Sequence, residues 1–206
     1  MSVVVTSCYT RYLESGPRLG YFASRMNTLK NTFPVIVLSL ALAALPGCAG
    51  APDGVNPVEG FELQRYLGTW YEIARLDHSF ERGMSQVTAE YSMRNDGGVR
   101  VVNRGFRVAT GEWDEAVGKA YFTGDSNIGQ LKVSFFGPFY GGYNILELDK
   151  TAYQYSLVAG PDRDYLWILS RTPRMDPATL EQLVATAADL GFATDKLIFV
   201  DQERVH

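Results

Sequence analysis

The stretch GTWYEIAR, residues 68–75, is the most informative part of the chain for the fold. Its glycine permits a tight turn, and the aromatic and β-branched residues that follow predict a strand. Side chains alternate across a strand, so Trp70 and Glu72 are expected on one face. If that face points into the protein, the Glu72 carboxyl must be paired, hydrogen-bonded or protonated.

Alternation of this kind recurs along the chain, with short turns rich in Gly, Asn and Asp between the segments. Eight strands are predicted, at about 69–76, 87–94, 99–104, 114–123, 131–135, 143–148, 153–159 and 165–171. Consecutive antiparallel strands with short connections favour an up-and-down barrel, which leaves no free edges. The expected fold class is therefore all-β, and an eight-stranded barrel can enclose one small ligand.

A change of period after the last strand predicts a helix. Asp176 followed by Pro177 is typical of a helix start, and Gly191 of a helix end. The apolar residues between them form one stripe: Leu180, Leu183, Val184, Ala187 and Ala188. We expect this stripe to pack on the outside of the barrel against strand 165–171, and residues 197–200 to form a short closing strand.

The order of the strands also predicts which end of the barrel is open. Connections alternate between the two ends, and loops 77–86, 107–113, 137–142 and 160–164, which share one end, are mostly long or aromatic. We call this end the mouth and the other end the floor. Phe80, Phe139 and Tyr140 lie on the mouth loops, where they either contact a ligand, partner or lipid, or fold back as plugs.

Four residues are expected at the floor. Trp70 begins the first strand there, with Gly68 at the turn before it, and Arg171 ends the last strand at the same level. An arginine over a tryptophan ring makes a cation–π contact, so we predict that Arg171 stacks on Trp70. Asp149, at the end of strand 143–148, belongs to this end as well.

The inner face and the mouth supply the candidate ligand-binding residues. Alternation makes this set mainly apolar, with small residues that leave volume unfilled and polar groups at 103, 143 and 155 that can orient a headgroup. The set comprises Ala74, Phe80, Ala89, Tyr91, Val101, Asn103, Ala120, Phe122, Val133, Phe135, Tyr143, Ile145, Tyr155 and Trp167.

The first 48 residues are expected to be a targeting segment. Residues 35–45, VIVLSLALAAL, have the length of a signal-peptide core, and Met26 gives a more typical start than Met1. The following LPGC resembles the lipobox of bacterial lipoproteins, which implies that Cys48 is lipid-modified. The alternative is an ordinary cleaved signal with a free thiol. Residues 49–58 read as a flexible tether.

Composition weighs against two other functional classes. The net charge is −4 and no run of Lys or Arg occurs, so nucleic acid is not expected as a partner. Beyond Cys48 the chain has no cysteine, and its histidines are His78 and His206. There is no Gly-x-Ser-x-Gly motif or metal-ligand spacing, and adjacent Asp77 and His78 are weak evidence for an enzyme. No cofactor or metal is expected.

Three stretches together resemble the lipocalins, and more specifically the bacterial outer-membrane lipoprotein lipocalins related to apolipoprotein D. They are GTWYEIARLDHSFERG from residue 68, KVSFFGPFYGGYNILELD from residue 132 and GPDRDYLWILSRTP from residue 160, and the likeness covers 59–206. The resemblance implies storage or transport of fatty acids or lysophospholipids by a protein anchored at the periplasmic face of the outer membrane. A structural or partner-binding lipoprotein is the alternative, a lipid-modifying enzyme is disfavoured, and a homodimer remains open.

Overall fold

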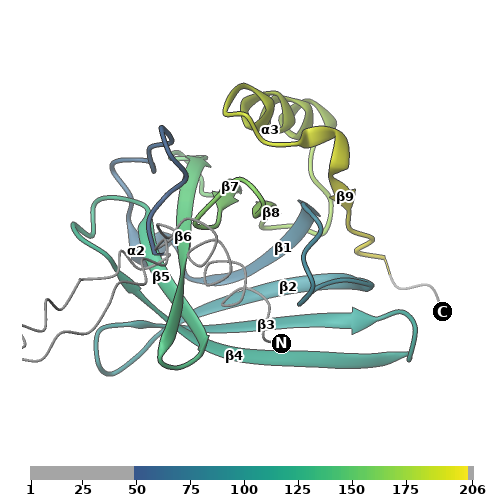
Figure 1. The fold of residues 1–206 in the computed structure, drawn as a ribbon, viewed down its shortest axis with the longest axis horizontal. Helices are drawn as coiled ribbons and strands as arrows, with labels where there is room; N and C mark the ends of the chain where they lie inside the picture. The colour runs from purple at the N-terminus through teal and green to yellow at the C-terminus, as the bar shows by residue number, and fades with distance from the viewer. Residues whose placement is uncertain (1–48, 204–206) are drawn as a thin grey trace, which may run out of the picture.

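The protein is an eight-stranded antiparallel barrel, seen in a computed structural model that describes residues 49–203 (Figure 1). Each strand pairs with the next, and β1 pairs with both β2 and β8, which closes the barrel. The strands are β1 (Gly68–Arg75), β2 (Met84–Met93), β3 (Val99–Arg107), β4 (Glu112–Phe122), β5 (Gln130–Phe136), β6 (Phe139–Leu148), β7 (Tyr155–Ala159) and β8 (Leu166–Ser170). The predicted up-and-down barrel is confirmed. The signal segment with Met26 and Cys48 lies outside the described residues, as does His206.

Alternation along the strands divides the apolar residues into an inner and an outer cluster. The inner cluster fills the floor half of the barrel around Trp70, Tyr91, Val101 and Ile145. The outer cluster lies on the opposite face of β1, β7 and β8 and includes Leu157. Both faces of these strands are therefore buried, which explains why segment 165–171 shows no polar face in the sequence.

Helix α3 (Pro177–Asp189) covers the outer cluster, as its apolar stripe predicts (Figure 1). The Asp176 side chain caps the helix by accepting a hydrogen bond from the Thr179 N–H at 2.9 Å, and Pro177 takes the first turn. Leu183 and Ala187 are its buried residues, and they pack with the outward side chains of β7 and β8. The helix thus stabilises the barrel wall and leaves the interior untouched.

Residues 49–58 are part of the folded domain, which corrects the expectation of a flexible tether. Val55 is buried in the outer cluster, and the Val58 N–H donates to the Ile145 carbonyl at 2.8 Å. The segment leads to α2 (Leu63–Tyr66), which brings Tyr66 into the inner cluster. Apolar side chains in a segment that looked like a polar linker are what hold it to the barrel.

The C-terminal segment completes the wall where β1 and β2 diverge. After the short helix η1 (Thr194–Lys196), strand β9 (Ile198–Phe199) pairs with Ala74 and Arg75 at the mouth end of β1. Beyond it, the Gln202 side-chain amide donates to the carbonyl of Glu72 at 2.6 Å and to that of Val87 at 2.9 Å. Gln202 therefore bridges β1 and β2 across the gap.

Candidate functional site

The candidate site is the inner face of the barrel above its packed floor. Side chains of this face pack against the inner cluster yet keep part of their surface accessible, unlike the fully buried Trp70 and Ile145. Asn103 lies directly opposite Ala89 on the neighbouring strand and so shares its face. The half-buried inner residues are Ala89, Asn103, Phe122, Val133, Phe135, Tyr143 and Trp167. Tyr91, Val101 and Ala120 belong to the same cluster and are buried.

Two of the expected inner residues lie elsewhere. The register of β1 against β8 shifts between Glu72 and Ala74, so Ile73 forms a bulge and Ala74 joins the outer cluster. Tyr155 is also packed against the outer cluster, because Ser156 and Val158 are the residues of β7 that point inward. Neither Ala74 nor Tyr155 lines the interior.

Three tyrosine hydroxyls meet in the interior and form a chain. The Tyr143 hydroxyl lies 2.8 Å from the hydroxyls of both Tyr66 and Tyr91, and the Tyr66 hydroxyl also donates to Ser156 Oγ at 3.3 Å. Burial raises the pKa of Tyr66 to about 12 and the pKa values of Tyr91 and Tyr143 well above 10. The chain is therefore neutral and can offer a hydrogen-bonding group to a ligand.

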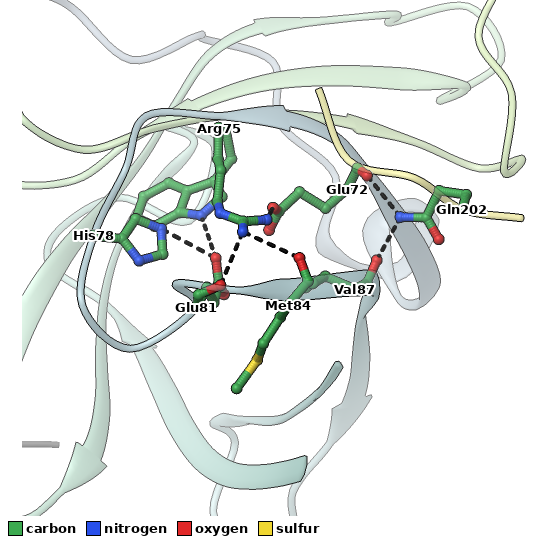
Figure 2. A network of polar contacts seen from close by, with 8 residues as sticks. Glu72, Arg75, His78, Glu81, Met84, Val87 and Gln202 are labelled. Atoms are coloured by element: carbon green, nitrogen blue, oxygen red, sulfur yellow. Dashed lines mark hydrogen bonds and ion pairs between the residues drawn. The ribbon is translucent and has the colours of Figure 1, made fainter. Parts of the chain in front are cut away.

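A buried ion pair lies nearer the mouth, and the bulge of β1 creates it. By skipping one residue, the bulge turns both Glu72 and Arg75 inward, and Arg75 Nη1 donates to Glu72 Oε1 at 2.6 Å (Figure 2). Arg75 Nη2 donates to the carbonyls of Glu81 at 2.8 Å and Met84 at 3.2 Å. The contact with Arg75 therefore accommodates the Glu72 carboxyl inside the barrel.

The loop between β1 and β2 folds back over the mouth with its own buried groups. Trp167 Nε1 donates to Glu81 Oε2 at 3.2 Å. His78 Nε2 lies 3.0 Å from the same oxygen (Figure 2). The His78 ring stacks on Phe80 with centroids 3.8 Å apart. Phe80 therefore folds back onto the buried His78 ring, and Asp77 pairs with Arg82 instead of with His78.

The two buried carboxyls of this cluster have opposite pKa shifts. Burial raises the pKa of Glu72 well above its usual value, and the nearby Glu81 raises it further against the effect of Arg75. Burial alone would also raise the pKa of Glu81, but its contacts with His78, Glu72 and Trp167 hold it below the usual value. Burial and the neighbouring Glu81 therefore favour the protonated form of Glu72, whereas the contacts of Glu81 favour its ionised form.

The floor residues take the predicted positions. The Arg171 guanidinium lies 4.0 Å from the centre of the Trp70 ring and donates to the carbonyls of Thr69 at 3.0 Å and Arg65 at 2.7 Å. Gly68 has a φ of +92°, in the left-handed region that favours glycine, so glycine suits this turn. Asp149 accepts backbone hydrogen bonds within the β6–β7 turn at the same end.

The sequence patterns did not identify Arg75, Glu81 or Tyr66 as interior groups. Arg75 falls on the wrong face by simple alternation, and Glu81 lies in a loop that looked exposed. A usable signal was present, since His78, Phe80 and Glu81 form an aromatic and charged cluster unusual for a loop. Phe139, by contrast, is 53 % exposed at the start of β6 and does not fold back.

Residues 49–203 contain neither a cluster that could hold a metal ion nor a helix that could cross a membrane. Between residues 49 and 203 no group of three or more His, Cys, Asp or Glu side chains is placed to hold a metal ion. Over the same range no helix has the length and apolar character needed to cross a membrane. Two surface hollows of about 270 and 360 Å³ lie on the outside, at the β7–β8 turn and the β2–β3 turn.

The eight-stranded up-and-down barrel with a helix packed on its outside is the fold of a lipocalin. The lipocalin-like domain family matches residues 61–202, and the chain belongs to the lipocalin family. Among solved structures, insecticyanin from the tobacco hornworm Manduca sexta has a TM-score of 0.61 at 23 % identity, covering 75 % of this chain and 88 % of its own. The cockroach allergen Per a 4 has a TM-score of 0.59 at 22 % identity, covering 75 % and 96 %.

Much more similar sequences exist among bacterial lipocalins. The outer membrane lipoprotein Blc of Vibrio cholerae is 56 % identical over 168 residues, which are 82 % of this chain and 98 % of the relative. Blc of Escherichia coli K12 is 51 % identical, with 82 % and 96 % covered. Apolipoprotein D of Bos taurus is 32 % identical, with 82 % and 95 % covered. The resemblance seen in the sequence is thus confirmed.

Proposed function

We propose that the protein binds one fatty acid or lysophospholipid in its barrel, without catalysis, at the periplasmic face of the outer membrane. The observation that carries the proposal is the set of inward-facing side chains that remain partly accessible above a packed floor. Apolar walls at Ala89, Val133 and Phe135 suit an acyl chain. The tyrosine hydroxyls and the Glu72–Arg75 pair provide polar atoms for a headgroup.

The location rests on the relatives and on the sequence before residue 49. The similar proteins of Vibrio cholerae and Escherichia coli are named outer membrane lipoproteins. The LPGC motif resembles a lipobox and supports a lipid on Cys48, which precedes the folded domain in the sequence. A diacylated cysteine would hold the protein at the membrane without a spanning segment.

Ligand uptake by the delipidated protein tests the proposal. A brominated fatty acid and a brominated lysophospholipid should each quench Trp167, which is half-buried at the inner face. Ala89→Phe should fill the interior and abolish the quenching, whereas Thr88→Phe, on the outer face of the same strand, should leave it intact. Val133→Phe is a second blocking variant, and thermal unfolding checks that all three fold.

Native mass spectrometry of the gently purified protein identifies the ligand class. A bound mass that matches a fatty acid or a lysophospholipid, and that is absent from Ala89→Phe, would support the proposal. Failure of the unmodified protein to take up either lipid, with normal unfolding behaviour, would contradict it and favour a structural or partner-binding role.

A further inference from the structure

Exposed apolar side chains gather at the mouth of the barrel. In the described part of the chain, the exposed large apolar residues are Met93, Val108, Trp113, Val117, Phe136, Phe139, Ile198 and Phe199. Val108 and Trp113 belong to the β3–β4 hairpin and are 63 % and 48 % exposed. Phe136 and Phe139 flank the two-residue β5–β6 turn and are 60 % and 53 % exposed. Both hairpins turn at the mouth, and side chains of this size on protruding turns mark a contact surface.

The N-terminal segment of the domain is also held at the mouth end. The Gly50 carbonyl accepts a hydrogen bond from Asn144 Nδ2 at 3.0 Å, and Asn144 also donates to Gly160 in the β7–β8 turn at 2.9 Å. The Asp53 carbonyl accepts from Arg163 Nη2 of that turn at 3.0 Å. The chain therefore enters the domain beside the mouth and runs from there toward the floor.

The remaining distance is short enough to bring the anchor to the hairpin tips. Cys48 is two residues before Gly50, which gives a reach of about 7 Å. Gly142, beside the Gly50 carbonyl, is three strand residues from Phe139, or about 10 Å along β6. A lipid on Cys48 would thus enter the membrane close to the level that Phe136 and Phe139 reach.

The chemistry of these tips fits lipid better than a protein partner. The apolar side chains are on two separate hairpins, whereas a stable protein interface needs a contiguous, well-packed patch. Phe and Trp side chains insert readily at a bilayer interface, which adapts to separate points of contact. Arg107 and Arg104 of β3 already pair with Asp114 and Glu115 of β4, so attraction to anionic headgroups is not the main force.

From these observations we infer that the mouth of the barrel docks on the same membrane leaflet that holds the Cys48 lipid, with the β3–β4 and β5–β6 hairpin tips inserted in its interface. The inference rests on the proposed function, because it requires the anchor. A docked mouth would let an acyl chain pass between bilayer and barrel without crossing water.

Site-specific fluorescence on the full, lipidated chain in phosphatidylethanolamine–phosphatidylglycerol vesicles tests the docking. An environment-sensitive dye is attached at Thr110→Cys, in the β3–β4 turn, or at Ser126→Cys, in the floor turn between β4 and β5. Both positions are exposed and polar. We expect a blue shift and quenching by spin-labelled phospholipid at position 110, no change at position 126, and the same result in 1 M NaCl, a concentration at which electrostatic attraction is screened to about 3 Å.

The tip residues are tested in the same vesicles. Combined Phe136→Ser and Phe139→Ser should remove most of the quenching at position 110, while Val117→Ser, on the outer wall, should not change it. Equal signals at positions 110 and 126, or a dye at 110 that stays in water, would overturn the docking. An intact mass without lipid on Cys48 would overturn it too. Ligand uptake, measured on the same samples, judges the proposed function separately.

Discussion

Glu72 and Arg75 lie on the same face of β1, three residues apart, and form an ion pair of 2.6 Å inside the barrel. Regular alternation would have placed them on opposite faces, and the bulge at Ile73 brings them together. Their side chains are 4 % and 2 % exposed, so both groups have lost almost all of their hydration. Such a pair adds little net stability, but either partner left alone would be costly.

The raised pKa of Glu72 predicts how stability depends on pH. Since the folded-state pKa of Glu72 is raised, the folded protein binds more protons than the unfolded one above the usual glutamate range. The contribution of Glu72 to the free energy of unfolding should therefore fall as pH rises from the usual glutamate range through its folded-state pKa. Glu72→Gln mimics the protonated form, so urea unfolding between pH 6 and pH 9 should show a flatter profile for this variant.

Glu112→Gln, at an exposed position of β4, is the control and should keep the slope of the unmodified protein. Glu81 contributes with the opposite sign, because its pKa is lowered. The contribution of Glu81 to the free energy of unfolding is present at pH values above the usual glutamate pKa. It is lost as pH falls through the folded-state pKa of Glu81. A Glu72→Gln profile as steep as that of the unmodified protein would show that Glu72 is already ionised in the folded state.

Removing the middle hydroxyl of the tyrosine chain should be more costly than removing an end. Tyr143→Phe leaves the Tyr91 hydroxyl without its partner and leaves Tyr66 with Ser156 alone. A buried hydroxyl without a partner costs about 1–3 kcal/mol, so we expect a loss in this range in urea unfolding. Tyr91→Phe should cost less, and equal losses for the two variants would argue against a linked chain.

The floor pair should matter for stability and not for ligand choice. Arg171→Ala removes the contact with the Trp70 ring at 4.0 Å and the hydrogen bonds to Thr69 and Arg65. Together these contacts predict a loss of about 3 kcal/mol in the free energy of unfolding. Arg171→Lys should recover part of it. The prediction fails if the loss is below about 0.5 kcal/mol, the level of an ordinary surface substitution.

The outer helix can be weakened without touching the interior. Leu183, on the buried face of α3, is 1 % exposed, and Leu183→Ala should lower stability by about 2–4 kcal/mol through the cavity it leaves. Glu181→Ala, on the exposed face of the same helix, is the matched control. Both variants should take up fatty acid with unchanged affinity in the quenching assay, and a large loss of affinity in Leu183→Ala would connect the helix to the interior.

Most of the fold could be predicted from local patterns. Alternation and turn residues located the eight strands, and Asp176, Pro177 and Gly191 marked the helix. Trp70 and Arg171 could be paired from topology alone, since both lie at the same end of neighbouring strands. These features depend on contacts that each segment makes in a regular geometry.

The interior was harder to predict, because irregular geometry decides it. The bulge at Ile73 arises where β1 leaves β2 and continues against β8 and β9, a constraint that the sequence of β1 does not contain. It moved Ala74 outward and Arg75 inward. For Tyr155, the strand begins there and pairing with β8 sets its face. The loop that carries His78 and Glu81 folds inward because Glu81 contacts Arg75 of β1 and Trp167 of β8. Trp167 is distant in the sequence, and simple alternation assigns Arg75 to the other face of its strand.

The bridge that Gln202 makes between Glu72 and Val87 has a consequence for biogenesis. One side of the barrel wall is joined by Gln202, which follows all eight barrel strands in the sequence, while the strands that it joins are made near the beginning of the domain. A growing or partly exported chain can form the hairpins one after another, but it cannot form this bridge until Gln202 is present. Ligand capture should therefore require a chain that extends through Gln202.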